Sequence, residues 1–197
     1  MKINFIDAIK DELITCLESK GGKLGGNYIN NIRCPSCNEP EAYTFVEDPT
    51  IIHCNRKKNC GLSIHAKQFA PHLFRDWSSR FPATKEDSKR TAKFYLKSRG
   101  LDTSCFEFEQ SLWKEDDWER NTVAFKCDWS GRRWHRLIDP PTGVRKTRWD
   151  SGNGVAYRGY AWMNQQVDPE VELWVVEGII EALSLQQGVG IQAAATF

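Results

Sequence analysis

Long hydrophobic segments are absent from this sequence of 197 residues. Apolar runs such as Trp174 to Val176 are far shorter than the about 20 residues that a membrane-spanning helix needs. The amino terminus, which begins Met1-Lys2-Ile3-Asn4, also lacks the apolar core of a secretory leader. We therefore expect a soluble, cytoplasmic protein with no membrane association.

The sequence also lacks a strong net charge and an even number of cysteines. Its 27 Lys and Arg residues nearly balance 26 Asp and Glu residues, and the seven cysteines cannot all pair. A reducing compartment disfavours disulfides, so metal binding is the better explanation for clustered cysteines. A composition that is 40% hydrophobic and 27% charged excludes disordered and fibrous proteins and predicts one or two globular domains.

Charges of opposite sign are segregated along the chain. Residues 55–99 contain twelve Lys or Arg residues and three acids, which gives a local charge of +9. A second basic stretch covers residues 132–148, whereas acids collect in residues 107–119 and 168–181. Local basic surfaces of this kind are typical of proteins that bind nucleic acids.

Hydrophobic periodicity predicts an α+β fold. We expect the protein to contain an N-terminal domain built on a β-ribbon that cysteines bracket (residues 1–81), a basic mixed α/β subdomain (82–170) and the start of a βαβ unit (171–197). The helices are expected at 5–17, at 62–77 where Pro71 either kinks the helix or begins a second one, at 84–98 with a left-handed stop at Gly100, and at 179–187. The strands are expected at 42–46, 51–53, 122–125, 132–138, 144–149, 172–176 and 191–197.

Four cysteines have the spacing of metal ligands. Cys34 and Cys37 form a Cys-x2-Cys turn, and Cys54 precedes Cys60 across a predicted β-hairpin. Four thiolates on two such turns predict a closed tetrahedral site for structural Zn²⁺. Two alternatives stay open: His53 or His65 replaces one thiolate, or the four cysteines are simply buried.

Basic and aromatic residues accompany the cysteines. The run Arg56, Lys57 and Lys58 would offset the negative charge of a four-thiolate zinc site and present positive charge outward. Tyr28, Tyr43 and Phe45 are possible stacking surfaces, which suggests a reader of single-stranded nucleic acid. Alternatively, the basic run is a solvated turn and the aromatic residues form a small core.

Three segments, taken in order, make the chain resemble the amino-terminal half of a DnaG-type DNA primase, including the phage and mobile-element versions fused to helicases. The first combines Gly26-Asn27-Tyr28 with the cysteine turns and is similar to the family's zinc ribbon. Residues 95–101, which contain Arg99-Gly100-Leu101, resemble the short helix that opens the catalytic core. Residues 173–183 resemble the first Toprim motif, in which a strand delivers a glutamate, here Glu177.

The resemblance implies an enzyme that makes short RNA primers from ribonucleoside triphosphates on a single-stranded DNA template, with a replicative helicase as partner or fusion. Glu177 would be catalytic and would bind Mg²⁺ or Mn²⁺ or act as a base, while Lys146 and Arg148, and less strongly Arg136, would contact nucleotide or template. Alternatively, Glu177 is an ordinary carboxylate at a helix amino terminus, and Lys146 and Arg148 belong to a solvated edge strand.

The sequence departs from the family pattern in one respect. A Toprim site needs later acids, usually Asp-x-Asp, and no Asp-x-Asp occurs in this sequence. We therefore expect a truncated chain that binds DNA but is inactive by itself. The alternatives are a non-catalytic zinc-ribbon module that binds single-stranded DNA and a fragment of a Toprim nuclease or topoisomerase.

Overall fold

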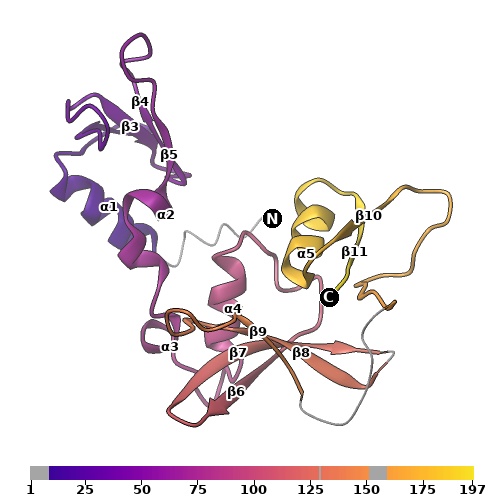
Figure 1. Ribbon diagram of the computed structural model, residues 1–197. Helices are drawn as coiled ribbons and strands as arrows, with labels where there is room; N and C mark the ends of the chain where they lie inside the picture. The colour runs from indigo at the N-terminus through magenta and orange to yellow at the C-terminus, as the bar shows by residue number, and fades with distance from the viewer. Residues whose placement is uncertain (1–8, 129, 151–158) are drawn as a thin grey trace. The chain divides into compact units, whose positions relative to one another are not determined.

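The computed structural model describes residues 9–128, 130–150 and 159–197 (Figure 1). The chain divides into two compact units, Met1–Arg75 and Asp76–Phe197, which are described separately. The mixed α+β character predicted from the sequence is confirmed. The predicted domain limits at residues 81/82 and 170/171 stay predictions.

The first unit is built on one antiparallel sheet with the strand order β1-β2-β3-β4-β5. The predicted hairpin strands correspond to β3 and β4, while the predicted first helix overlaps α1, although residues 5–8 lie outside the described residues. The elements are α1 (Lys10–Ser19), β1 (Lys23–Gly25), β2 (Tyr28–Ile32), β3 (Ala42–Phe45), β4 (Ile51–Cys54) and β5 (Ser63–His65).

Helix α1 packs its apolar stripe against the sheet of the first unit. Leu13 and Leu17 are fully buried, as are Ile29 and Ile32 of β2. Gly22 connects the helix to the sheet, and a Cβ atom there would lie 2.8 Å from the Leu17 carbonyl oxygen. A side chain at this position would therefore push the helix away from the strand that it covers.

The predicted kinked helix over residues 62–77 is replaced by four short elements. Ser63–His65 joins the sheet as β5, and α2 (Ala66–Phe69), a 3-10 turn (Pro71–Phe74) and α3 (Trp77–Arg80) follow. His65 caps α2, since its Nδ1 accepts the Lys67 N–H at 3.1 Å. Because Pro71 has no N–H to donate, α2 does not continue through it, and Pro71 begins the 3-10 turn, as the second of the two expectations had it.

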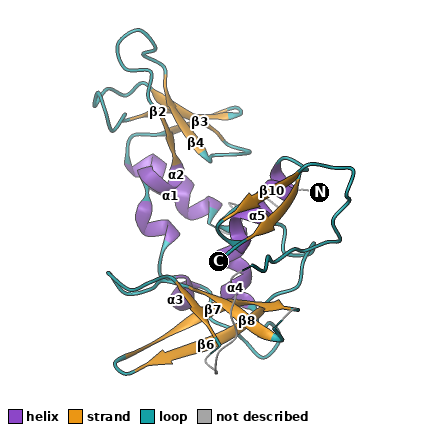
Figure 2. Ribbon diagram, turned by 45° about the vertical axis from the view of Figure 1, so that its right-hand side comes forward, coloured by secondary structure: helices purple, strands orange, loops and turns teal. Residues whose placement is uncertain are grey.

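The second unit contains an antiparallel sheet with the order β6-β7-β8-β9 and helix α4 against β6 and β7 (Figure 2). Gly100 has a φ of +77°, which confirms the predicted left-handed stop after the helix. β6 was not predicted, and β9 is shorter than expected. These elements are α4 (Arg90–Lys97), β6 (Glu109–Glu115), β7 (Trp118–Cys127), β8 (Arg132–Leu137) and β9 (Thr147–Trp149).

The end of the chain forms a strand–helix–strand unit. β10 (Leu173–Val176) pairs in parallel with β11 (Gln192–Ala195), and α5 (Ile179–Gly188) connects them. Ile179 and Leu183, which belong to α5, are fully buried. The predicted order of strand, helix and strand is therefore confirmed, and its parallel pairing is that of a βαβ crossover.

Candidate metal centre and nucleic-acid-binding surfaces

The four predicted cysteine ligands meet at one point in the first unit. The sulfur atoms of Cys34, Cys37, Cys54 and Cys60 all lie within 4.8 Å of one another. The Cys34–Cys60 and Cys37–Cys54 sulfur pairs are each 3.8 Å apart. A tetrahedral zinc ion with Zn–S bonds of about 2.3 Å requires sulfur-to-sulfur distances of about 3.8 Å. The cluster therefore has the size and donor set to hold a metal ion such as zinc.

Backbone hydrogen bonds shape the two turns that carry the thiols. In the first turn, the Asn38 N–H donates to the Cys34 carbonyl at 2.9 Å. In the second, the N–H groups of Cys60 and Gly61 both donate to the Arg56 carbonyl, at 2.8 and 3.1 Å. Gly61 has a φ of +60°, a conformation that favours glycine. Each turn thus directs two sulfur atoms toward the same point.

The thiols differ in how readily they ionise. Burial raises the pKa of Cys54 to about 12, whereas the backbone N–H of Leu62, hydrogen-bonded to its sulfur, lowers the pKa of Cys60 to about 7. A bound cation favours the thiolate form at every ligand, because the metal takes the place of the proton. All four donors are sulfur, which suits a structural site closed to water.

The two histidines that could have replaced a thiolate hold other partners. His53 places its Nδ1 2.9 Å from the Ser63 hydroxyl oxygen, and His65 caps α2. Neither belongs to the metal-ligand group found among the described residues. In the part of the chain that the structure describes, the donor set is therefore four cysteines.

The basic run lies beside this cluster, on the second turn. Arg56 pairs with Glu39 at 3.4 Å, and Lys57 and Lys58 are exposed. A four-thiolate zinc site carries a formal charge of −2, which these cations would partly neutralise. The two lysines also keep positive charge at the surface next to the centre.

Three aromatic rings form a cluster on one face of the same sheet, which we call the aromatic trio: Tyr28, Tyr43 and Phe45. The Tyr28 ring lies 5.0 Å from the Phe45 ring and 6.0 Å from the Tyr43 ring, measured between centroids. Tyr28 is 40% exposed and Phe45 is 43% exposed. Because Ile29 and Ile32 fill the core of this unit, the trio is a surface feature and not the core.

Glu177 lies between β10 and α5, where the sequence predicts it. The residue is exposed, directly follows Val176 and precedes the buried Gly178. Gly178 has a φ of −149°, which is extended backbone that any residue can adopt. A Cβ atom there would meet only the carboxylate of Glu181, an exposed side chain that can move aside, so the structure does not require glycine at this position.

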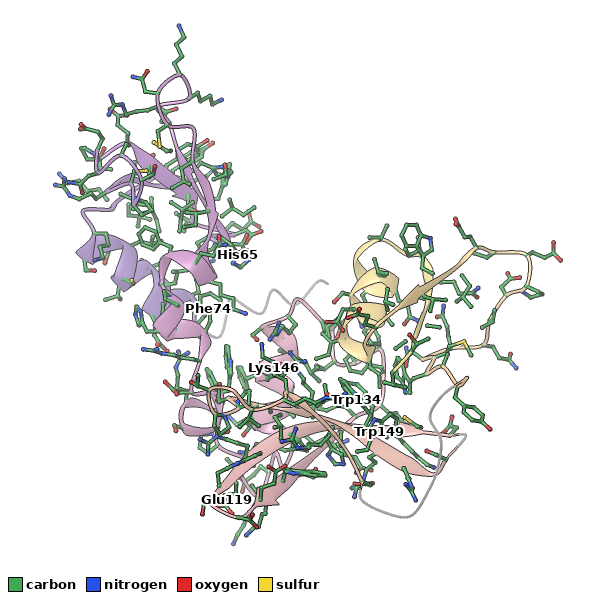
Figure 3. All side chains as sticks on the ribbon, in the orientation of Figure 1. His65, Phe74, Glu119, Trp134, Lys146 and Trp149 are labelled. Atoms are coloured by element: carbon green, nitrogen blue, oxygen red, sulfur yellow. The ribbon has the colours of Figure 1, made fainter. Side chains whose placement is uncertain are left out.

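The structure does not present Lys146 and Arg148 as a pair on one strand. Lys146, which is labelled in Figure 3, is exposed and precedes β9. Arg148 lies within β9. Arg148 donates to both carboxylate oxygens of Glu115, at 2.6 and 3.3 Å. Its hydrogen bond lowers the pKa of Glu115, so the ion pair persists at neutral pH. Arg148 is therefore already neutralised by β6, and Lys146 is the more accessible cation.

Arg136, which the sequence predicts as a nucleotide or template contact, shares one acceptor with Arg99, which the sequence did not predict as a site residue. Arg99 and Arg136 each donate to the phenol oxygen of Tyr95, both at 3.2 Å. Within the described ranges, neither arginine has a carboxylate at ion-pair distance. Each guanidinium has five N–H donors, and the phenol satisfies one bond of each. We call these two residues the arginine pair, and it has donors left for an anion.

A His–Asp pair in the sheet of the second unit resembles part of a catalytic group, but its histidine is too buried to reach a substrate. His135 is 2% exposed, its Nε2 lies 2.8 Å from Asp150, and its Nδ1 lies 3.1 Å from the Thr122 hydroxyl. Burial lowers the pKa of His135, although Asp150 opposes this effect. The Ser111 and Thr122 hydroxyls also bond each other at 2.8 Å. We interpret the group as a polar layer that fixes the register of the sheet.

No family model, curated protein or solved structure matches this chain in comparisons with known proteins. In the part of the chain that the structure describes, no helix has both the length and the hydrophobicity of a transmembrane span.

Proposed function

We propose that this chain binds single-stranded DNA and forms the amino-terminal, template-reading part of a DNA primase. The observation that carries the proposal is the exposed aromatic trio on the same sheet as the four-cysteine centre. Exposed rings on a rigid sheet accept stacked bases of any sequence, and adjacent cations attract the phosphate backbone. A closed zinc site would hold the sheet rigid without taking part in chemistry.

The second unit supports the proposal with an anion site of its own. The arginine pair offers planar guanidinium donors, and these bind phosphate in bidentate geometry. Phosphate contacts of this kind position a strand without reading its sequence. Base stacking would therefore fall to the first unit, and backbone binding to both.

The aromatic trio is tested by the double substitution Tyr28→Ala and Phe45→Ala in the full chain. We expect the affinity for single-stranded DNA to fall about 5- to 100-fold, because base stacking on an aromatic ring contributes about 1–3 kcal/mol per base. Fluorescence anisotropy with labelled oligothymidylate measures this loss. Leu24→Ala is the matched control, since Leu24 is 62% exposed in the same sheet but is not aromatic. Equal affinity in the double variant and wild type would remove the trio from the DNA-binding surface.

Substituting both members of the arginine pair tests the second contact. We expect the double variant Arg99→Gln and Arg136→Gln to bind DNA about 10- to 100-fold more weakly. A hydrogen bond to a charged group contributes about 1.5–3 kcal/mol, and solvent screens part of this contribution. The control, Lys114→Gln with Lys126→Gln, removes two charges from the sheet of the same unit. If the control weakens binding as much as the arginine variant does, the effect is one of net charge and the site is wrong.

The catalytic part of the proposal rests on Glu177. A carboxylate at the end of a strand, followed by a helix, is a suitable ligand for Mg²⁺ or Mn²⁺, which would neutralise a ribonucleoside triphosphate during primer synthesis. We further propose that Lys146 contacts nucleotide phosphate and that a replicative helicase is the partner. Arg148 can take part only if it leaves Glu115.

A non-catalytic module that binds single-stranded DNA is the second candidate function. One observation favours it: the four cysteines are the only candidate metal-ligand group found among the described residues. Both candidates predict DNA binding, so template-dependent incorporation of ribonucleotides by a version of the chain extended to include further acidic residues separates them.

A further inference from the structure

Helix α4 presents three cations on its outward face, which we call the α4 cation face: Arg90, Lys93 and Lys97. These residues lie at positions i, i+3 and i+7, so they share one side of the helix. The buried side consists of Thr91, Ala92, Tyr95 and Leu96. Residues 89–99 contain five Lys or Arg residues and no acid.

An aromatic stack supports the cations of this face. The Phe94 ring lies 4.1 Å from the Phe81 ring at an interplanar angle of 6°. The Arg90 guanidinium carbon and the Lys97 ammonium nitrogen lie 5.9 and 5.8 Å from the centre of the Phe94 ring. Contact with an aromatic ring restricts a long side chain while its polar end still faces water. Arg90 and Lys97 are thus partly ordered before any ligand arrives.

Among the described residues, neither Arg90 nor Lys97 forms an ion pair, although the Lys93 hydrogen bond and, to a lesser degree, the Arg90 charge lower the pKa of Asp87. Lys93 pairs with Asp87 at 2.6 Å, but Arg90 and Lys97 have no carboxylate at ion-pair distance in the described part of the chain. At about 1.5 Å of rise per residue, they are separated by about 10 Å along the helix. Arg99, a member of the arginine pair, follows Lys97 by two residues. The arginine pair therefore lies at the carboxyl end of the same helix, on the side of Tyr95, whereas Arg90 and Lys97 lie on the side of Phe94.

We propose that the α4 cation face binds the phosphate backbone of a single strand as it extends beyond the arginine pair. This inference rests on the proposed function, because it takes single-stranded DNA as the ligand and adds a second length of contact to it. A row of cations on one helix contacts successive phosphates and contributes no base specificity. The face therefore adds affinity only when the strand is long enough to reach it.

The test uses a double variant of the full chain that carries both Arg90→Gln and Lys97→Gln. Its DNA binding is compared with that of wild type. The probes are oligothymidylates that bracket the about 4–16 nucleotide site sizes of single-strand-binding domains, titrated at several salt concentrations. With the long probe, we expect the slope of log affinity against log salt to fall by about 1.4, since each lost phosphate contact removes about 0.7. With the shortest probe, we expect no change.

The Lys114→Gln with Lys126→Gln variant again controls for net charge. An unchanged salt slope in the Arg90 and Lys97 variant, with a lowered melting temperature, would overturn the inference and assign both cations to packing over Phe94. An equal loss with short and long probes would overturn it too. If wild type binds neither probe, the proposed function fails. If the Tyr28 and Phe45 variant loses affinity while the Arg90 and Lys97 variant keeps the wild-type salt slope, the proposed function stands and only the α4 cation face is removed.

Discussion

Removal of the metal ion is expected to unfold the first unit and leave the second unit folded. The first unit ends at Arg75, and its core consists of a few aliphatic side chains from α1 and the sheet. A core of this size supplies little stability, whereas structural zinc contributes about 10–16 kcal/mol to the folding of small zinc domains. Among the described residues, the two turns are otherwise joined by weaker contacts, such as the Arg56–Glu39 ion pair and the hydrogen bond from the Asn55 N–H to the Glu41 carbonyl.

Metal analysis of the purified chain should give one zinc ion per molecule. A strong chelator should then abolish the circular dichroism and amide-exchange protection of the first unit. All eight tryptophans lie at residue 77 or later, so their fluorescence reports on the second unit alone and should not change. Acidification should release the metal as well, because protons compete for the thiolates.

Cys37→Ser is the substitution that tests the same point without a chelator. We expect it to lose the zinc ion and the fold of the first unit, while Cys16→Ser keeps both, because Cys16 lies on α1 outside the cluster. Zinc-free protein with a protected sheet would contradict a structural role for the centre. Loss of metal without loss of fold in Cys37→Ser would do so too.

The features that the sequence predicted are those that local spacing determines. The four cysteines lie on two tight turns, and strong apolar runs mark β10 and α5, so neighbouring residues alone specify these elements. The same holds for β3 and β4, which alternate buried and exposed residues.

The features that the sequence did not predict depend on distant partners. β6 is rich in polar residues and forms a strand because it pairs along its length with β7. Arg148 meets Glu115 across 33 positions, and Arg136 meets Tyr95 across 41. Periodicity carries no information on such contacts, so it could identify basic residues but not which of them are already neutralised.

Substitution of Glu177 is expected to abolish primer synthesis without weakening DNA binding. Glu177→Gln keeps the size of the side chain and removes the charge that would hold a divalent ion. In a version of the chain extended to include further acidic residues, we expect the rate of ribonucleotide incorporation to fall on the order of 100-fold or more, since a catalytic metal ion contributes several kcal/mol to transition-state stabilisation. The affinity for single-stranded DNA should not fall, because Glu177 is an exposed negative charge and its removal takes away no attraction to DNA phosphates.

Glu172→Gln is the matched control, because Glu172 is an exposed glutamate directly before the same strand. Incorporation with Mg²⁺ and with Mn²⁺ should stay at the wild-type rate in this variant. If Glu177→Gln is as active as wild type, Glu177 is a carboxylate at the amino terminus of α5. Its loss would then cost only about 0.3–1 kcal/mol of folding stability through the helix dipole, and a melting curve detects this. Wild-type protein that binds the template but incorporates no ribonucleotide with either metal favours the non-catalytic module, because DNA binding needs the trio and the arginine pair but not Glu177.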